Sequence, residues 1–272
     1  MAESIGESID NLQGDEEALK QFEKKRVGRS IFFACDCVAY TPEQLGLKTR
    51  SRRRAEEEEP VAMPPGTPPL FGAAQKRVPS WPDGIVRFRF TTPTLSAEAK
   101  AMFREACLVW ERAAGNNGRR KFVSFVEITS ASAGRHIRVR AGAPNINQAS
   151  TGAVADAFVA IGFLNKGSIV HELGHVLGLV HEHQRHDRDQ FVTRGAAVAG
   201  NPNFRLHSAA EDRIRTPYDF GSIMHYGREV MLNGQRVVAL TPKPPFQAQA
   251  AVMGQRNAPS AHDIAAIRAI YA

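Results

Sequence analysis

The chain has 272 residues, 43% of them hydrophobic, with a formal charge of +7 and a sequence pI near 9.6. This length and apolar content favour a globular enzyme with a substantial core. Its three cysteines are too few for the paired framework of a small disulfide-stabilised secreted domain. The positive charge permits binding to nucleic acid, anionic membrane or acidic polypeptide, and it does not choose among these partners.

The first 78 residues have the composition of an N-terminal extension. Residues 1 to about 30 show the loose apolar spacing of a short charged helix, and an apolar patch follows at 31–33. Basic, acidic and Pro-rich runs then occupy 48–69, and such runs cannot pack a core. We therefore predict a linker there and a separate folded domain at 79–272.

The N-terminus carries acids where a signal peptide needs a basic start and an apolar stretch. No apolar run approaches the length of a membrane span. The basic run at 50–54 has the usual meaning of a solvated linker, so we expect no specific nucleic-acid partner. The sequence thus predicts no membrane span, and either a cytoplasmic location or export by a route that needs no signal peptide.

Residues 79–272 mix strands and helices. Residues 85–90 alternate in part like a strand, and Ser96 opens an amphipathic helix that Gly115 ends. The strand-like runs that follow are 121–128, 136–141 and 153–164, the last being either a strand or an apolar loop. That run leads into a helix near Gly167, and the chain closes with a helix at 260–271. The predicted fold class is a mixed α/β domain with its sheet before the helix at Gly167.

The segment HELGHVLGLVHEH at 171–183 has the spacing of a metal site. Four helical residues advance about 400°, so His171 and His175 share one face and can reach one ion. A continuing helix would turn His181 away from that ion, so the helix must end between the second and third histidines. Gly178 can close it, because glycine adopts the left-handed backbone that ends helices. We predict one Zn²⁺ per chain, held by the three histidines.

Glu172 is the predicted general base. Three neutral histidines leave the charge of Zn²⁺ uncompensated, so a water in the fourth position ionises near neutral pH, with Glu172 adjacent to take its proton. One alternative is an amphipathic helix with surface histidines. Another is a non-enzymatic zinc module, but a structural zinc site needs no base and normally closes its fourth position with a protein ligand.

The extended pattern H-E-x-x-H-x-x-G-x-x-H at 171–181, followed by Ser-Ile-Met-His-Tyr at 222–226, resembles the astacin family of metzincin proteases. Further segments are similar to the family in the same order, namely 81–84, 218–221 and 254–271. The resemblance covers roughly 79–272. It implies a zincin-like α/β catalytic domain with a twisted mixed sheet, an active-site zinc helix and a largely irregular C-terminal subdomain.

The resemblance also implies zinc-dependent hydrolysis of peptide bonds in polypeptide substrates. It gives Tyr226 the role of stabilising the oxyanion, although the residue alone could be a buried aromatic. It implies that Met224 packs beneath the histidines and is not a metal ligand. Astacins often favour an acidic residue just after the scissile bond, and Lys243 is our candidate to bind it, with Arg228 and Arg236 as rivals.

The chain departs from the family pattern in its cysteines. Astacins typically carry four in two disulfides, whereas only Cys107 lies in this domain, which favours the location predicted above. Many astacins also have a prosegment whose aspartate occupies the zinc, and Asp15 is the nearest match. Cys35 or Cys37 offers a thiolate as a second latency ligand. The remaining alternatives are an unrelated delivery segment and a permanently latent protease.

Overall fold

The structure is a computed structural model that describes residues 32–34, 38–40, 75–76, 78–91, 95–130, 134–144, 146–213, 216–232 and 235–272. The predicted N-terminal helix, the predicted linker and the candidate latency residues Asp15, Cys35 and Cys37 lie outside these residues. No helix among the described residues is long and apolar enough to cross a membrane.

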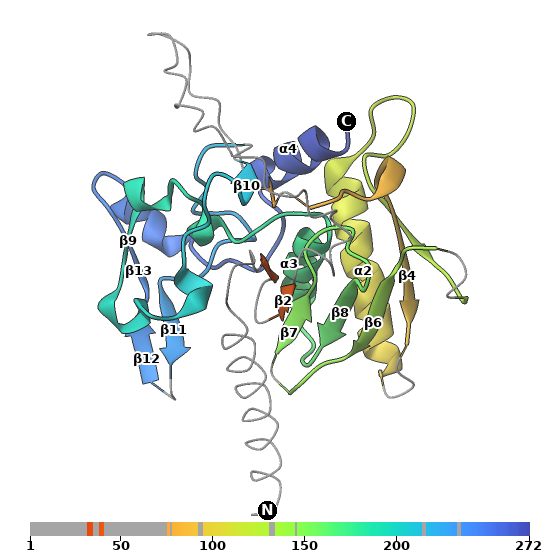
Figure 1. The fold of residues 1–272 in the computed structure, drawn as a ribbon, viewed down its shortest axis with the longest axis horizontal. Helices are drawn as coiled ribbons and strands as arrows, with labels where there is room; N and C mark the ends of the chain where they lie inside the picture. Colours follow the sequence, from red (N-terminus) through yellow and green to blue (C-terminus); the bar gives the residue numbers. More distant parts are fainter. Residues whose placement is uncertain are drawn as a thin grey trace, which may run out of the picture.

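A five-stranded sheet forms one side of the molecule (Figure 1). Its strands, in spatial order, are β5 (Ser124–Glu127), β4 (Ile85–Phe90), β6 (Ile137–Ala141), β8 (Phe158–Ile161) and β7 (Asn147–Ala149). All neighbouring pairs are parallel except β7 with β8, so the sheet is mixed and β7 is an antiparallel edge. The predicted strands at 85–90, 121–128 and 136–141 are confirmed within these bounds, and 153–164 contains a strand.

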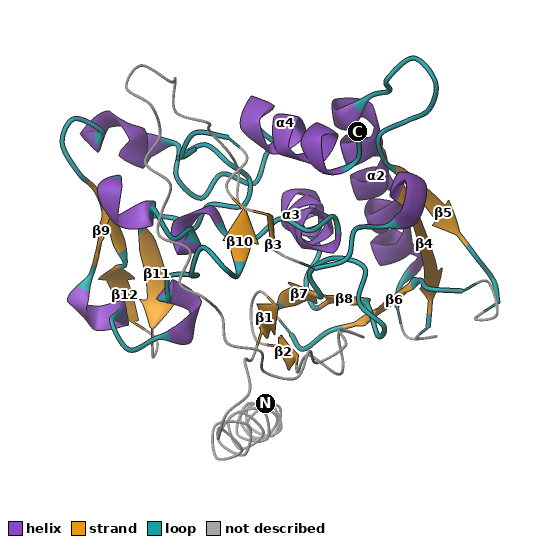
Figure 2. Ribbon diagram, turned by 45° about the horizontal axis from the view of Figure 1, so that its top comes forward, coloured by secondary structure: helices purple, strands orange, loops and turns teal. Residues whose placement is uncertain are grey.

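Two helices cover one face of this sheet, α2 (Ala97–Ala114) and α3 (Lys166–Val176) (Figure 2). The Ser96 side chain caps α2 by accepting a hydrogen bond from Ala99 N, and Gly115 ends the helix at φ 72°. Phe103 of α2 packs on Phe88 of β4, with ring centroids 5.0 Å apart. Together these contacts bury the apolar side of the sheet and hold the helices against it.

Residues after α3 form short irregular elements on the opposite side of that helix (Figure 1). All strands outside the five-stranded sheet that the structure describes pair two by two, including three that precede this sheet in the chain. The pairs are β1 (Phe32–Ala34) with β2 (Val38–Tyr40), β3 (Gln75–Lys76) with β10 (Asp212–Arg213), β9 (Val192–Arg194) with β13 (Leu240–Pro242), and β11 (Glu229–Leu232) with β12 (Gln235–Val238). The 3-10 helices are η1 (Pro82–Gly84), η3 (Glu182–Gln184), η4 (Arg188–Gln190), η5 (Ala196–Val198), η6 (Pro202–Phe204) and η7 (Gln247–Ala251).

The last helix, α4 (Ala261–Ile270), brings the chain back to the first half. Arg268 Nε donates to Ala114 O at the end of α2 (2.8 Å), and the Tyr271 hydroxyl donates to Leu177 O at the end of α3 (3.0 Å). The predicted helix at 260–271 is thereby confirmed. The irregular region therefore begins at α3 and ends at α4, and both helices contact the sheet region.

Candidate active site

Helix α3 carries the first two histidines and ends where the sequence predicted. Gly178 has φ 104° and its N–H donates to His175 O (2.8 Å), while Leu179 N donates to Gly174 O (3.0 Å). These two hydrogen bonds form a Schellman motif, in which a glycine in left-handed backbone closes the helix. The chain therefore reverses after Gly178 and returns His181 to the face that carries His175.

Each histidine of the triad is held by its Nδ1 atom. The three acceptors are Ile223 O for His171, Leu179 O for His175 and the Gln184 side-chain oxygen for His181, at 2.7, 2.8 and 3.0 Å. Since a donating Nδ1 carries the proton, each neutral ring presents an unprotonated Nε2. Burial lowers the pKa of His171 and His181 well below the ordinary value, which keeps both rings neutral.

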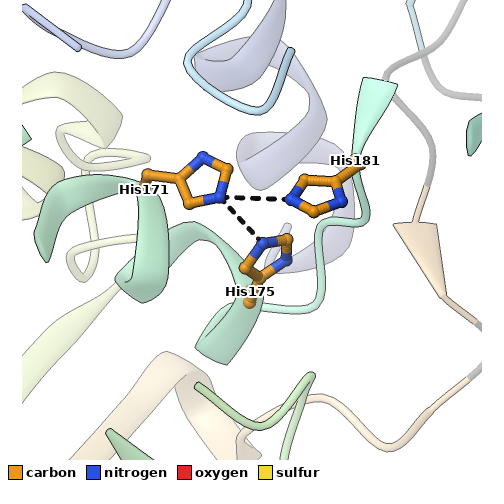
Figure 3. Close-up of side chains that lie close together, drawn as sticks. All are labelled: His171, His175 and His181. Atoms are coloured by element: carbon orange, nitrogen blue, oxygen red, sulfur yellow. Dashed lines mark hydrogen bonds between the residues drawn. The ribbon is translucent and has the colours of Figure 1, made fainter. Parts of the chain in front are cut away.

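The three Nε2 atoms face a common point (Figure 3). His171 Nε2 lies 3.2 Å from His175 Nε2 and 3.3 Å from His181 Nε2. Three buried lone pairs converging in this way need a cation between them. Tetrahedral zinc with Zn–N bonds of about 2.0–2.1 Å would separate its nitrogen ligands by about 3.3–3.4 Å. The spacing and the donor chemistry therefore fit one zinc ion.

Met224 lies directly beneath the zinc helix. Its side chain is buried, and a Cβ placed on Gly174 would come within 2.5 Å of the Met224 sulfur. Only glycine at 174 lets the methionine approach α3 this closely. Met224 O also accepts a hydrogen bond from Glu182 N (3.1 Å), next to the third histidine. This placement agrees with a packing role for Met224.

A buried aspartate that no sequence pattern predicted supports the turn that contains Met224. Asp263 on α4 accepts hydrogen bonds from Ser222 Oγ (2.6 Å) and Ile223 N (2.9 Å). Ile223 in turn provides the carbonyl that orients His171. The only sequence signal was the Ser260-x-x-Asp263 capping box, which marks the start of a helix and says nothing of this contact.

Tyr226 lies beside the third histidine. Its half-buried ring is 4.3 Å from the His181 ring and stacks on His183 with centroids 4.1 Å apart. His183 is itself fixed, because its Nε2–H donates to Asn203 O (2.9 Å). The structure thus brings the predicted oxyanion-stabilising residue to the triad, over a histidine that the sequence analysis did not single out.

The remaining predicted residues occupy different surroundings. Glu172 follows His171 on α3 and is only 2% exposed. The Lys243 ammonium donates to the backbone carbonyl of Asp189, which ties the residue after β13 to η4. Of its two rivals, Arg228 is exposed and Arg236 forms an exposed ion pair with Glu229 at 3.5 Å. Lys243 is therefore the most firmly positioned of the three basic candidates.

Comparisons with known proteins agree with this geometry. The family model described as Astacin, a peptidase family, matches residues 73–272. Bone morphogenetic protein 1 of Xenopus laevis is 32% identical over 199 residues, covering 70% of this chain and 27% of that protein. High choriolytic enzyme 1 of Oryzias latipes is 38% identical over 113 residues, covering 40% of each protein. The chain spans less than a third of the length of the first curated relatives it matches.

A solved structure supports the fold directly. High choriolytic enzyme 1, a hatching enzyme zinc-protease from medaka fish, matches with a TM-score of 0.54 and 29% sequence identity. The match covers 71% of this chain and 92% of that one. The mixed sheet, the zinc helix and the irregular C-terminal region predicted from the sequence are therefore confirmed as a zincin-like fold.

The same relatives overturn the predicted location. Bone morphogenetic protein 1 and the hatching enzyme are secreted extracellular proteases, which is at odds with a cytoplasmic chain. The low cysteine count misled the prediction. A buried Cys107 shows that this part of the described domain packs without a disulfide, and such packing is compatible with either compartment. Because the family match extends over residues 73–272 and the solved relative aligns over nearly its whole length, the chain belongs to the astacin family of zinc metalloendopeptidases.

Proposed function

We propose that this endopeptidase cleaves polypeptides with His171, His175 and His181 as its zinc ligands and Glu172 as its general base. The observation that carries the proposal is the convergence of three buried Nε2 atoms whose Nδ1 atoms are all hydrogen-bonded elsewhere. Zinc, when bound, supplies a Lewis acid that polarises the peptide carbonyl and acidifies water.

The protein's own groups move the protons. Glu172 is adjacent to His171 and almost fully buried, so its carboxylate acts in a low-dielectric site where electrostatic effects are strong. It takes a proton from the attacking water and returns it to the leaving amine. The Tyr226 hydroxyl donates a hydrogen bond to the oxyanion as the carbonyl becomes tetrahedral. The contact of the Tyr226 ring with His181 supports this role.

Two finer parts of the proposal concern substrate choice and latency. Lys243, tied to η4, would attract a carboxylate next to the scissile bond as a point charge. Residues 1–78 would restrain the domain at 79–272, and the start of the family match at residue 73 supports a boundary near there. If Asp15 is the group that reaches the metal, Asp15→Ala in the full chain should raise activity. If a cysteine is that group, Cys35→Ser with Cys37→Ser should raise it.

The central test measures zinc content and peptide cleavage on the same samples. Wild type should bind one zinc per chain and cleave unfolded polypeptides, chelators should abolish cleavage, and serine- or cysteine-protease inhibitors should have no effect. Glu172→Ala should keep its zinc and lose activity, whereas Glu98→Ala on α2 should change neither. Cleavage by Glu172→Ala at the wild-type rate would contradict the assignment.

The same assay separates Tyr226 from a structural tyrosine. Tyr226→Phe should lower kcat by about one to three orders of magnitude with little change in KM, because the lost donor acts only in the transition state. Tyr271→Phe is the matched control, since it likewise removes one tyrosine hydroxyl, and that buried hydroxyl bonds to the backbone carbonyl of Leu177 at the end of α3. That variant should lose stability and keep its kcat.

A further inference from the structure

The solvent side of the five-stranded sheet carries an array of arginines. Arg87 and Arg89 project from β4, and Arg138 and Arg140 from β6, the neighbouring strand. They alternate with the buried residues of the same strands, such as Phe88, which packs on α2. Because successive side chains of a strand point to opposite faces, all four lie on the side away from the helices. We call them the arginine face.

The arrangement of these arginines works against the stability of the sheet. Arg89 and Arg138 are register partners on adjacent parallel strands, so their side chains leave the same face of the sheet next to each other. Like charges directly opposite on neighbouring strands destabilise a sheet. Opposite charges do meet at this sheet elsewhere, where Arg104 of α2 binds Glu127 of β5. The cost indicates a use for the positive charge.

Within this face Arg138 and Arg140 are exposed, whereas Arg87 and Arg89 are half-buried. Arg89 Nε donates to His136 Nε2 (3.0 Å), and Arg140 lies over the Phe158 ring, 5.0 Å from its centroid. Arg138 pairs with Asp156 at 3.3 Å, but those two side chains are 45% and 78% exposed, so water screens the pair. Within the described strands of this sheet the one acidic residue is Glu127, which binds Arg104 of α2.

We propose that the arginine face is an exosite that binds an acidic segment of a polypeptide substrate, away from the bond that is cut. This inference rests on the proposed function. Guanidinium groups bind carboxylates through two parallel hydrogen bonds. Arginines two residues apart on a strand are separated by about 6.6 Å, which is also the spacing of alternate side chains in an extended peptide. The face therefore matches an extended acidic segment.

The position of the face suits a substrate that is already in the active site. The edge strand β7 packs on α3, the helix that carries two of the histidines. In the sheet order, β6 is two strands from β7 and β4 is three, or about 10 and 14 Å at the usual strand spacing. A substrate chain leaving the edge of the sheet reaches the arginine face within a few residues.

Single-stranded nucleic acid fits the face less well than a polypeptide does. Proteins that bind single strands stack the bases on exposed aromatic rings. The aromatic ring described on this face, Phe158, is 7% exposed and lies under Arg140. Carboxylates need no such platform, so an acidic peptide is the partner that the face favours.

The test uses three substrates that share one cleavable sequence: the short peptide, the peptide extended by about six Asp or Glu residues, and a Gly/Ser extension of equal length. Each extension is made on either side of the cleavable sequence. Wild type should cleave one of the acidic substrates with a KM about fivefold to tenfold lower than that of its Gly/Ser counterpart. The preference should weaken at high salt, as expected for exposed charges.

The variant Arg87→Gln with Arg140→Gln should abolish this preference and leave zinc content and the short-peptide kcat unchanged. Arg112→Gln with Arg119→Gln is the control, because it removes two exposed arginines from α2 and the following turn. An unaltered preference in the first variant would overturn the exosite, as would heparin binding that depends on Arg87 and Arg140 without any acidic-substrate preference. If no substrate is cut at all, the proposed function fails instead.

Discussion

The sheet region at 85–176 and the irregular region at 181–258 bury their backbones by different means. In the sheet region the strands and helices satisfy their own N–H and C=O groups, so apolar side chains can fill the space between them. Phe103, Ile137 and Val159 are fully buried in one continuous core. The free energy of folding there comes from many interchangeable apolar contacts.

The irregular region has little repetitive structure, and charged side chains satisfy its buried carbonyls. Arg188 donates to His183 O (3.1 Å) and Phe204 O (2.9 Å), and Arg185 donates to Thr216 O (3.1 Å). Both arginines are at most 2% exposed. Since every buried carbonyl needs a donor, a few polar residues hold this region in place. We therefore expect single polar substitutions to be more damaging here than in the sheet region.

The largest effect is expected at Arg185. Its guanidinium pairs with Glu182 at 2.6 Å and Asp187 at 2.7 Å, and burial raises the pKa of Glu182 to about 8 even though Arg185 lowers it. Arg185→Leu removes the buried cation that binds Glu182 and Asp187 and that donates to Thr216 O. The free energy of unfolding should fall by about 3–5 kcal/mol, as measured by urea denaturation of the zinc-loaded protein.

An exposed ion pair of the sheet region provides the matched control. Arg104 binds Glu127 at 2.8 Å with both side chains at least 40% exposed, so Arg104→Leu should cost less than about 1 kcal/mol. Equal losses for the two variants would remove the distinction between the regions. A larger loss for Arg104→Leu would reverse it.

The second prediction concerns the contact between helix α4 and the turn that contains Met224. Asp263→Ala removes the acceptor that fixes Ser222 and Ile223, and so loosens the carbonyl that orients His171. Groups that orient metal ligands typically change metal affinity by about 10–100-fold, and for this indirect contact we expect about tenfold weaker zinc binding. A competition titration with a zinc chelator measures the dissociation constant.

The control for this prediction lies in the same capping box. Ser260→Ala removes the hydroxyl that accepts from Asp263 N, while the bonds from Asp263 to Ser222 and Ile223 remain. It should cost about 1 kcal/mol of stability, as other N-cap losses do, and leave zinc affinity unchanged. Identical zinc affinities for Asp263→Ala and wild type would show that the aspartate only stabilises the helix.

The difference between the regions also explains what the sequence could reveal. The alternation along β4 and β6 and the caps Ser96 and Gly115 are local signals, so the sheet and α2 could be predicted. The strand at 147–149 was missed because three residues show no period. In the irregular region, contacts such as Arg188 with Phe204 join residues 16 apart without any pattern between them.

The active site shows the same limit. The three histidines and Gly178 were predictable because helix geometry requires that spacing. The partner that orients His171 is the backbone carbonyl of Ile223, and a carbonyl has no residue-type signature. The link from Asp263 to Ser222 spans 41 residues, so the capping box was visible in the sequence and its second role was not.

The smallest expected effect is at an ion pair of the irregular region that is only partly buried. Arg205 binds Glu211 through two parallel hydrogen bonds (2.9 and 3.0 Å), and Ser208 N donates to the same carboxylate (2.8 Å). Burial raises the pKa of Glu211, but these hydrogen bonds and the Arg205 charge outweigh it and lower the pKa to about 2, from an ordinary 4.5. Glu211→Gln should therefore reduce stability at neutral pH, by less than about 1 kcal/mol for so accessible a pair.

The pH dependence gives this prediction its sign. A carboxyl group whose pKa is lower in the folded state stabilises the protein above its unfolded pKa, and that contribution is lost as pH falls toward the folded value. The difference in Tm between wild type and Glu211→Gln should thus be constant above about pH 5 and shrink below pH 4.5. Glu105→Gln, which breaks an exposed 3.4 Å pair with Lys166, should change Tm less at neutral pH. A Tm difference that grows on acidification would mean that Arg205 does not hold Glu211 ionised. This partly exposed pair would then contribute nothing to the stability of the irregular region.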